Sequence, residues 1–300
     1  MLKILLAAIL IVAIQWTTTG QNLYYIKVLG EEKVSFGTFT HKRLKKDKIG
    51  KFLIKDITAD DLRTHFNLDS SRKTIVFIHG WLSNIPPYDR DGIKAFKKMA
   101  ELRPDIQAVN IIEIIWRPHR LRYTKSWDNA PRHGKNLSGL LQQIAEIQDG
   151  NLIIACHSMG HRVLQGVLEN WQMPINQRIF DKVLFFAPDL DTDAFDNAFK
   201  NLPNQTSYLA IYRNEKDRSL LFSRWFHRRK RLGRHGFNHP PAANNVEMIN
   251  LTKNRDQRRD AVRHVYHKYP TVQEDAALVM ANDFEKRKVI KGEDYQYILK

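Results

Sequence analysis

The sequence predicts an α/β fold in which a mostly parallel central sheet carries helices on both faces. Apolar runs of the length expected for strands buried on both sides recur along the chain. Most of them precede a segment with helical periodicity, and this alternation produces parallel strands joined by right-handed crossovers. Within residues 151–163 an apolar run changes directly into a helical pattern at Ser158, so this serine is expected at a strand-to-helix turn.

Residues 1–20 have the pattern of an export signal. Lys3 lies in a short positive start, residues 4–14 form an apolar core, and the small residues Thr18 and Gly20 follow. This core is too short to span a bilayer, which favours cleavage, although an uncleaved amphiphilic anchor is an alternative. We therefore expect a single folded domain over residues 21–300, in a protein that is periplasmic, extracellular or associated with the cell envelope.

The strands are predicted from their apolar and β-branched runs. Residues 23–28 are expected to form an edge strand, and the lysine-rich residues 33–55 a solvated hairpin with a charged edge. Buried strands are expected in the rest of the chain at 74–78, 108–116, 152–155, 182–187, 207–212 and, as the last strand, 246–251.

The helices are predicted from apolar residues that recur every three or four positions. They are expected at 92–102, at 137–147, directly after Ser158, and at 271–282 as a closing helix. A loop with Pro86 and Pro87 precedes the first of them. The polar residues 117–136 are expected to form a long connection at the carboxyl edge of the sheet, where open α/β sheets bind ligands.

Ser158 has the sequence context of a nucleophile. In the GxSxG nucleophile elbow, a tight turn lifts the serine hydroxyl off the end of the sheet, and small flanking residues let strand and helix approach. Here the second flanking residue is Gly160, whereas the first is Cys156, whose thiol is still small. Cys156 is the single cysteine and is expected to be a core residue. The alternative interpretation of Ser158 is an ordinary surface serine in a loop.

A serine hydroxyl needs a histidine to take its proton and a carboxylate to orient that histidine. In the order expected for an elbow serine, the acid follows the serine and the histidine comes last. His264 is the preferred base, and His267 in the same loop is the alternative. Asp217 is the preferred acid because it follows the penultimate predicted strand. Asp189, one strand earlier, is the alternative acid, although it also suits a helix N-cap or a turn.

The strand at 74–78 runs into His79, Gly80 and Trp81. A loop at this place supplies one of the two backbone N–H groups that bind an oxyanion, and the residue after the nucleophile supplies the other. The predicted oxyanion hole is therefore made by the backbone amides of Trp81 and Met159. His79 and Gly80 are expected to support the loop.

Several motifs in order resemble one family over most of the chain from residue 74. They are FIHGW, IIWRP, ACHSMGHRV, FAPDLDTDAF, DRSLL, RLG and HVYHKYPTV, and together they resemble the DUF900 group of α/β hydrolases. The resemblance implies an α/β hydrolase fold with a small or minimal cap, Ser158 as nucleophile and His264 as base. It leaves the acid open between Asp217 and Asp189. His161 stands where asparagine is common in that group.

The formal net charge of +16 predicts attraction to anionic partners. The strongest basic segment, residues 223–239, is predicted either to contact an anionic membrane or polymer or to be a solvated surface insertion. The residues expected to make such a contact are Arg224, Arg228, Arg229, Lys230 and Arg231. A nucleic-acid partner is not expected, because no binding module accompanies the segment. Neither a metal site nor a cofactor is expected, because no ligand spacing is complete.

The leading functional hypothesis is a serine hydrolase that cleaves carboxylic esters, with a small molecule or a lipid ester as substrate. The same chemistry can attack thioesters and amides. The second hypothesis is a catalytically inactive hydrolase-fold protein that uses its basic face for binding.

Overall fold

A computed structural model describes residues 21–39, 46–81, 91–103, 106, 109–119, 121–174, 176–292 and 296–299. The expected export signal and the loop with Pro86 and Pro87 lie outside these residues. Within them, no helix has both the length and the apolar character needed to cross a membrane.

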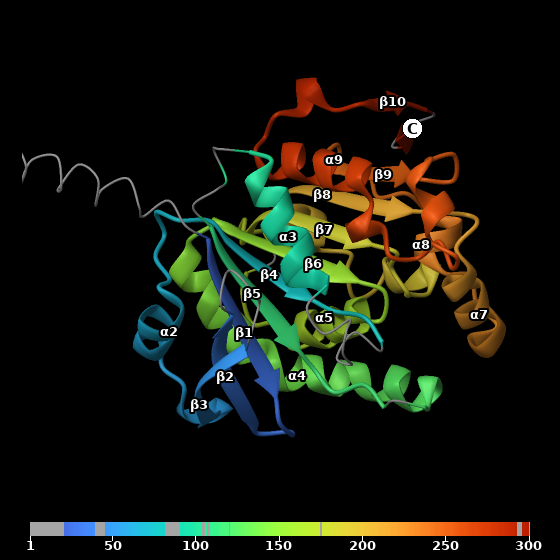
Figure 1. Cartoon of the computed structure of the whole chain (residues 1–300). Helices are drawn as coiled ribbons and strands as arrows, with labels where there is room; N and C mark the ends of the chain where they lie inside the picture. Colours follow the sequence, from blue (N-terminus) through green and yellow to red (C-terminus); the bar gives the residue numbers. More distant parts are fainter. Residues whose placement is uncertain are drawn as a thin grey trace, which may run out of the picture.

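One twisted sheet of eleven strands runs through the molecule (Figure 1) in the order β10-β11-β9-β8-β7-β6-β4-β5-β1-β2-β3. Pairing is parallel from β11 to β1 and antiparallel at the two ends, for β10 with β11 and for β1, β2 and β3. The strands are β1 Asn22–Val28, β2 Lys33–Phe39, β3 Lys46–Leu53, β4 Thr74–Ile78, β5 Asn110–Ile115, β6 Leu152–His157, β7 Phe180–Phe186, β8 Thr206–Arg213, β9 Val246–Asn250, β10 Val289–Lys291 and β11 Gln296–Leu299.

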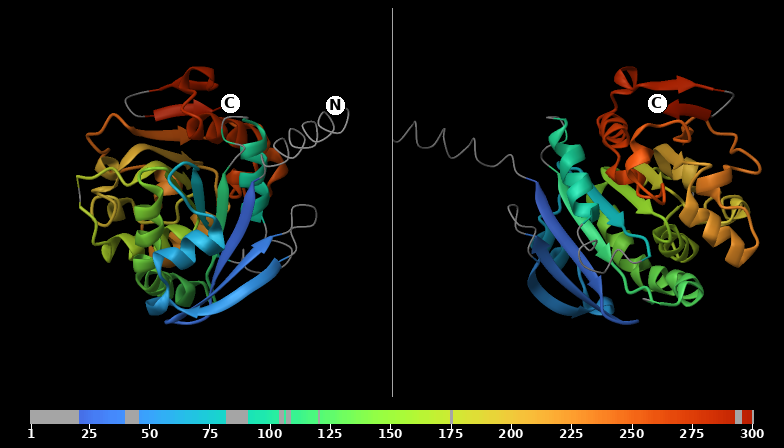
Figure 2. Two further views of the ribbon diagram at one scale, coloured as in Figure 1. Left: turned by 90° about the vertical axis from the view of Figure 1, so that its left-hand side faces the viewer. Right: turned by 45° about the vertical axis from the view of Figure 1, so that its right-hand side comes forward.

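Helices cover both faces of the sheet (Figures 1 and 2), as the sequence predicts. One face packs against α2, α4 and α5, and the other against α3 and α9. The α-helices are α2 Ala59–Phe66, α3 Asp91–Glu101, α4 Tyr123–Gln148, α5 Gly160–Glu169, α6 Leu202–Gln205, α7 Arg218–His227, α8 Leu232–His235 and α9 Pro270–Met280. Short 3₁₀ helices lie at Ile54–Asp56, Thr192–Ala194, Asp256–Arg259, Tyr266–Lys268 and Phe284–Lys286.

Three predicted elements are wrong. β1 is not an edge strand, because it pairs with β5 on one side and β2 on the other, which leaves β3 as the edge. Residues 117–136 are not a long loop, since α4 begins at Tyr123 and buries Ser126, Trp127 and Ala130 on one face. The strand near residue 246 is not the last, because the chain returns after α9 to add β11 beside β9.

Two glycines allow α4 and α5 to touch through their backbones. A Cβ on Gly134 of α4 would lie 1.9 Å from the carbonyl oxygen of Val163, and one on Gly166 of α5 would lie 2.0 Å from that of Pro131. The close approach holds α5, the helix that follows Ser158, firmly against α4.

We predict that Gly134→Ala lowers the free energy of unfolding by about 1–3 kcal/mol, because the new methyl group forces the two helices apart. Gly139→Ala is the matched control in the same helix, since nothing lies within 4 Å of its added Cβ. This control is expected to stabilise by about 0.5–1 kcal/mol through helix propensity. Urea denaturation of both variants measures the difference, and equal effects would contradict the close approach.

Candidate active site

Ser158 lies at the turn between β6 and α5 in a strained backbone conformation. Its φ of 52° is in the left-handed region, which a residue other than glycine adopts only when its surroundings hold it there. The backbone N–H of Ser158 donates to the carbonyl of Phe186 at 3.0 Å. Its own carbonyl accepts from the N–H groups of His161 and Asp189 at 3.2 and 3.3 Å. The expected nucleophile elbow is therefore the conformation that the structure has.

Two glycines bring other parts of the chain against this turn. A Cβ on Gly160 would lie 2.4 Å from the carbonyl oxygen of Ile78, so only glycine lets α5 start this close to β4. A Cβ on Gly80 would lie 2.8 Å from that of Ser158, so the loop after β4 passes directly beside the serine. Cys156, which replaces the first glycine of the motif, lies fully buried in β6 as a core residue.

A chain of hydrogen bonds joins Ser158 to residues from two later strand ends. The Oγ atom of Ser158 lies 2.8 Å from Nε2 of His264, and Nδ1 of His264 lies 2.7 Å from Oδ2 of Asp217. A carboxylate only accepts, so Nδ1–H donates to Asp217 and leaves Nε2 to accept the serine proton. Asp217 follows β8 and His264 follows β9. Both lie at the same edge of the sheet as Ser158, because the parallel strands that precede them all end there.

The Asp217 carboxylate accepts three hydrogen bonds and is fully buried. Besides His264, it accepts from the backbone N–H of Leu220 at 2.8 Å, which caps the N-terminus of α7. It also accepts from the hydroxyl of Tyr266 at 2.6 Å. The carboxylate cannot rotate away from His264 without breaking its bonds to Leu220 and Tyr266. The guanidinium of Arg234 donates to the backbone carbonyl of Asp217 at 2.7 Å and so holds the main chain at this residue.

The loop that carries His264 is held by a second carboxylate. Asp260 accepts from the backbone N–H groups of His264 and Val265 at 2.6 and 2.9 Å and from the hydroxyl of Tyr269 at 3.0 Å. Burial raises the pKa of Asp260, but these hydrogen bonds outweigh it and lower the pKa overall. Asp260 and Tyr266 were not predicted from the sequence. Their only signal is that they stand four residues before and two residues after His264.

His264 is the one buried histidine at the site whose pKa is raised. Burial alone disfavours the imidazolium, but the charge of Asp217 and its hydrogen bond more than offset burial. Burial lowers the pKa of His79 to about 4 and those of His161 and His267 to about 3. Of these buried histidines, His264 is therefore the one whose protonated form the site favours.

The two alternative residues lie nearby but outside the hydrogen-bond chain. His267 is buried against His157 and Phe77, with ring centroids at 4.5 and 5.7 Å. The Asp189 carboxylate accepts from the hydroxyls of Tyr123 and Ser223, each at 2.5 Å. Burial raises the pKa of Asp189, although Arg231 opposes the shift. The structure brings neither His267 to Ser158 nor Asp189 to His264 by hydrogen bonds.

The expected oxyanion residues flank the serine. Met159 follows Ser158 as the N-cap of α5, and among the described residues its backbone N–H has no acceptor. Trp81 lines the same cavity as Ser158, and its indole N–H donates to the carbonyl of His119 at 2.9 Å. The imidazole of His79 lies 2.7 Å from the carbonyl of Gly80 through Nδ1, and its carbonyl accepts from the indole of Trp116 at 2.7 Å.

A cavity of about 530 Å³ opens above Ser158. Its walls come from several loops and from α7, and most of the surface that they expose to the cavity is apolar. The lining residues are Trp81, Asp91, Tyr123, His157, Ser158, Asp189, Arg218, Ser219, Leu220, Phe222, Val262, His264, Val265 and His267. Within the described residues, no group of histidine, cysteine, aspartate and glutamate side chains could hold a metal ion.

One of the five basic residues expected to contact an anionic partner is buried and not exposed. Arg231 is fully buried, bonded to Asp191 and stacked 4.6 Å over the ring of Trp127, so it cannot contact an external anion. Its charge is neutralised inside the fold by the carboxylates that follow β7. The other four residues of the predicted contact, Arg224, Arg228, Arg229 and Lys230, are exposed.

The α/β hydrolases typically have a strained serine at a turn between a strand and a helix. A histidine and an aspartate from later strand ends are joined to this serine by hydrogen bonds. This chain has that arrangement. Residues 54–280 match the family described as alpha/beta hydrolase of unknown function (DUF900), and the chain belongs to this family. The predicted fold class and the family resemblance are confirmed.

Similarity to individual proteins is weaker. No curated protein matches the chain. Among solved structures, the product of the gene lin2722 of Listeria innocua matches with a TM-score of 0.43 and 14% identity, over 76% of this chain and 99% of that one. Aspergillus fumigatus lipase B matches with a TM-score of 0.28 and 15% identity, over 45% of this chain and 30% of that one. At these TM-scores neither likeness bears on the activity.

We predict that Asp217→Asn lowers the pKa of His264, because the charge that stabilises the imidazolium is removed. NMR titration of the His264 ring measures the change. Tyr266→Phe is the matched control, since it removes a hydrogen bond to the same carboxylate but keeps the charge. A pKa of His264 that falls equally in both variants, or in neither, would contradict the electrostatic role of Asp217.

Proposed function

We propose that this protein is a serine hydrolase that cleaves carboxylic esters through an acyl-enzyme at Ser158. The observation that carries the proposal is the continuous hydrogen-bond chain from Ser158 through His264 to Asp217, with distances of 2.8 and 2.7 Å. The apolar cavity above the serine supports a small-molecule or lipid ester as substrate. The signal-like pattern of residues 1–20 supports action outside the cytoplasm.

The reaction proceeds in two halves. In the first, Ser158 Oγ attacks the ester carbonyl carbon while His264 Nε2 takes the hydroxyl proton, and the backbone N–H groups of Trp81 and Met159 bind the resulting oxyanion. His264 then returns the proton to the leaving alcohol oxygen as the C–O bond breaks. In the second half, water attacks the acyl-enzyme with His264 again as base, which releases the acid and restores Ser158.

We expect a fluorophosphonate to label the purified protein at Ser158. Labelling should be lost in Ser158→Ala and in His264→Ala, and each change should lower kcat for a chromogenic ester by roughly 10⁶-fold. Ser138→Ala, which removes a serine hydroxyl on the exposed part of α4, is the control and should label normally. A folded protein without labelling at Ser158 would overturn the proposal and favour the inactive binding protein.

The pH dependence follows from the raised pKa of His264. Below this pKa the imidazole is protonated and cannot accept the Ser158 proton, so kcat/KM falls as pH decreases. The midpoint of this acid limb is expected above 6.5, the ordinary value for histidine. Asp217→Asn should move the midpoint down and lower kcat by roughly 10⁴-fold. A midpoint below 6.5 in the unmodified protein would rule out His264 as the base in this setting.

A further inference from the structure

Helix α7 turns a large apolar surface outward. Leu220 and Ser223 on its inner face are buried. Four large apolar side chains stand at positions i, i+1, i+4 and i+5 on the opposite side, so they form one continuous stripe. We call this stripe the α7 face: Leu221 (45% exposed), Phe222 (49%), Trp225 (73%) and Phe226 (41%). A surface helix normally has the reverse polarity, and a contiguous exposed patch of this kind marks an interaction site.

The inner side of α7 is fixed, so the helix cannot roll over to bury the α7 face. Its N-terminus is capped by Asp217. In the middle, Ser223 donates to Asp189 at 2.5 Å, and at the end the ring of His227 packs on Trp127 at 4.3 Å between centroids. The outward orientation of the four apolar side chains is therefore built into the fold.

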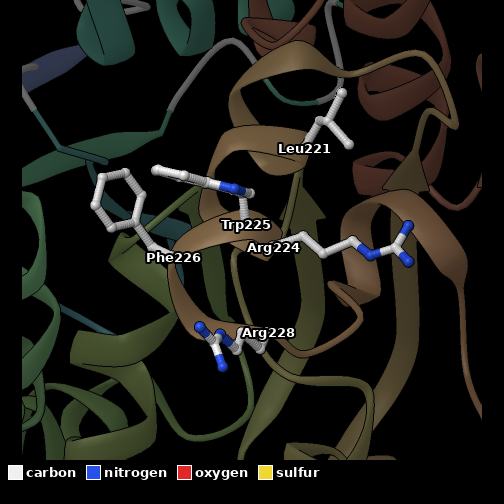
Figure 3. Close-up of a pocket in the computed structure, with 5 residues that line it drawn as sticks. All are labelled: Leu221, Arg224, Trp225, Phe226 and Arg228. Carbon is white, nitrogen blue, oxygen red and sulfur yellow. The ribbon is translucent and has the colours of Figure 1, made fainter.

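A basic rim adjoins the α7 face. It consists of Arg224, Arg228, Arg229 and Lys230, all exposed. Figure 3 shows Trp225 and Phe226 extending together to one side of the helix, while Arg224 reaches to the other and Arg228 lies beyond the last turn. Arg229 lies 3.9 Å from the carboxylate of Asp191, which already pairs with the buried Arg231. The rim thus presents excess positive charge beside the apolar stripe.

The α7 face meets the mouth of the Ser158 cavity. Phe222 belongs both to the exposed stripe and to the cavity wall, and Leu220 lines the cavity from the inner side of the helix. Val262, which also lines the cavity, is 45% exposed and lies beside the start of α7, because its carbonyl accepts from the N–H of Arg218 at 2.9 Å. Phe222 thus joins the apolar surface of α7 to the cavity.

We propose that α7 is a docking surface for an anionic phospholipid bilayer. Large aromatic and aliphatic side chains next to arginine and lysine are the composition that binds a membrane interface, where the apolar groups enter the acyl boundary and the cations contact lipid phosphates. An anionic polymer would complement the rim but would leave most of the α7 face in water. Docking needs no chemistry at Ser158. That lipid esters pass from the bilayer into the cavity rests on the proposed function.

The test uses the full chain and a fluorescent probe placed on the α7 face. The local probe distinguishes membrane contact at α7 from membrane contact made by residues 1–20. Because Cys156 is fully buried, a cysteine introduced by Leu221→Cys can be labelled selectively with an environment-sensitive fluorophore. Ile49→Cys on the opposite edge strand is the matched control, since Ile49 is 40% exposed. Phosphatidylcholine vesicles containing phosphatidylglycerol are expected to shift the Leu221→Cys emission to the blue and to leave the Ile49→Cys emission unchanged. Pure phosphatidylcholine should give a much smaller shift.

Charge variants in the Leu221→Cys background test the basic rim. Arg228→Glu with Lys230→Glu should weaken binding by roughly tenfold to a hundredfold. Lys48→Glu with Lys51→Glu changes net charge equally at the far edge of the sheet and should have little effect. Three outcomes would each overturn the proposal. They are equal weakening of vesicle binding by both pairs of charge variants, equal emission shifts at Leu221→Cys and Ile49→Cys, and binding of dextran sulfate without any emission shift on vesicles. Fluorophosphonate labelling of the same samples reports separately on Ser158.

Discussion

The site depends on one buried carboxylate, that of Asp217. One oxygen orients His264 and accepts from Tyr266, while the other caps the first turn of α7. A buried charge is stable only when several donors satisfy it, and here those donors come from two separate segments of the chain. The same contacts therefore fix the imidazole toward Ser158 and fix α7 above the cavity, so a change at Asp217 disturbs the hydrogen-bond chain and the position of α7 together.

The second constraint is the close approach of backbones around Ser158. Gly80 and Gly160 leave no room for a Cβ, which lets the loop after β4 and the start of α5 enclose a serine held at positive φ. Behind them, Gly134 and Gly166 press α4 against α5. Such strain persists only where the packing around it is rigid, and the sheet, both helices and the loop supply that rigidity.

Helix α7 links the candidate site to the surface. It starts at the carboxylate that orients His264, contributes Leu220 and Phe222 to the cavity, and turns the α7 face to the outside. Its position between β8 and β9 explains why the basic segment lies beside the cavity. Of the five residues predicted to contact an anion, Arg231 is buried and neutralises Asp191, whereas the other four lie at the surface.

The sequence by itself determined the order of strands and helices at the centre of the fold and the turn at Ser158, and it favoured His264 over His267, because apolar periodicity and motif spacing are local properties. It misassigned β1 and the start of α4, since edge position and the burial of polar-looking segments depend on distant partners. Only the tertiary structure decided between Asp217 and Asp189 as the partner of His264. It also showed that Arg231 is buried and that Tyr266 and Asp260 belong to the site. The reason is that both aspartates follow strands in similar sequence, and only the packing of loops from different strands sets which carboxylate reaches His264.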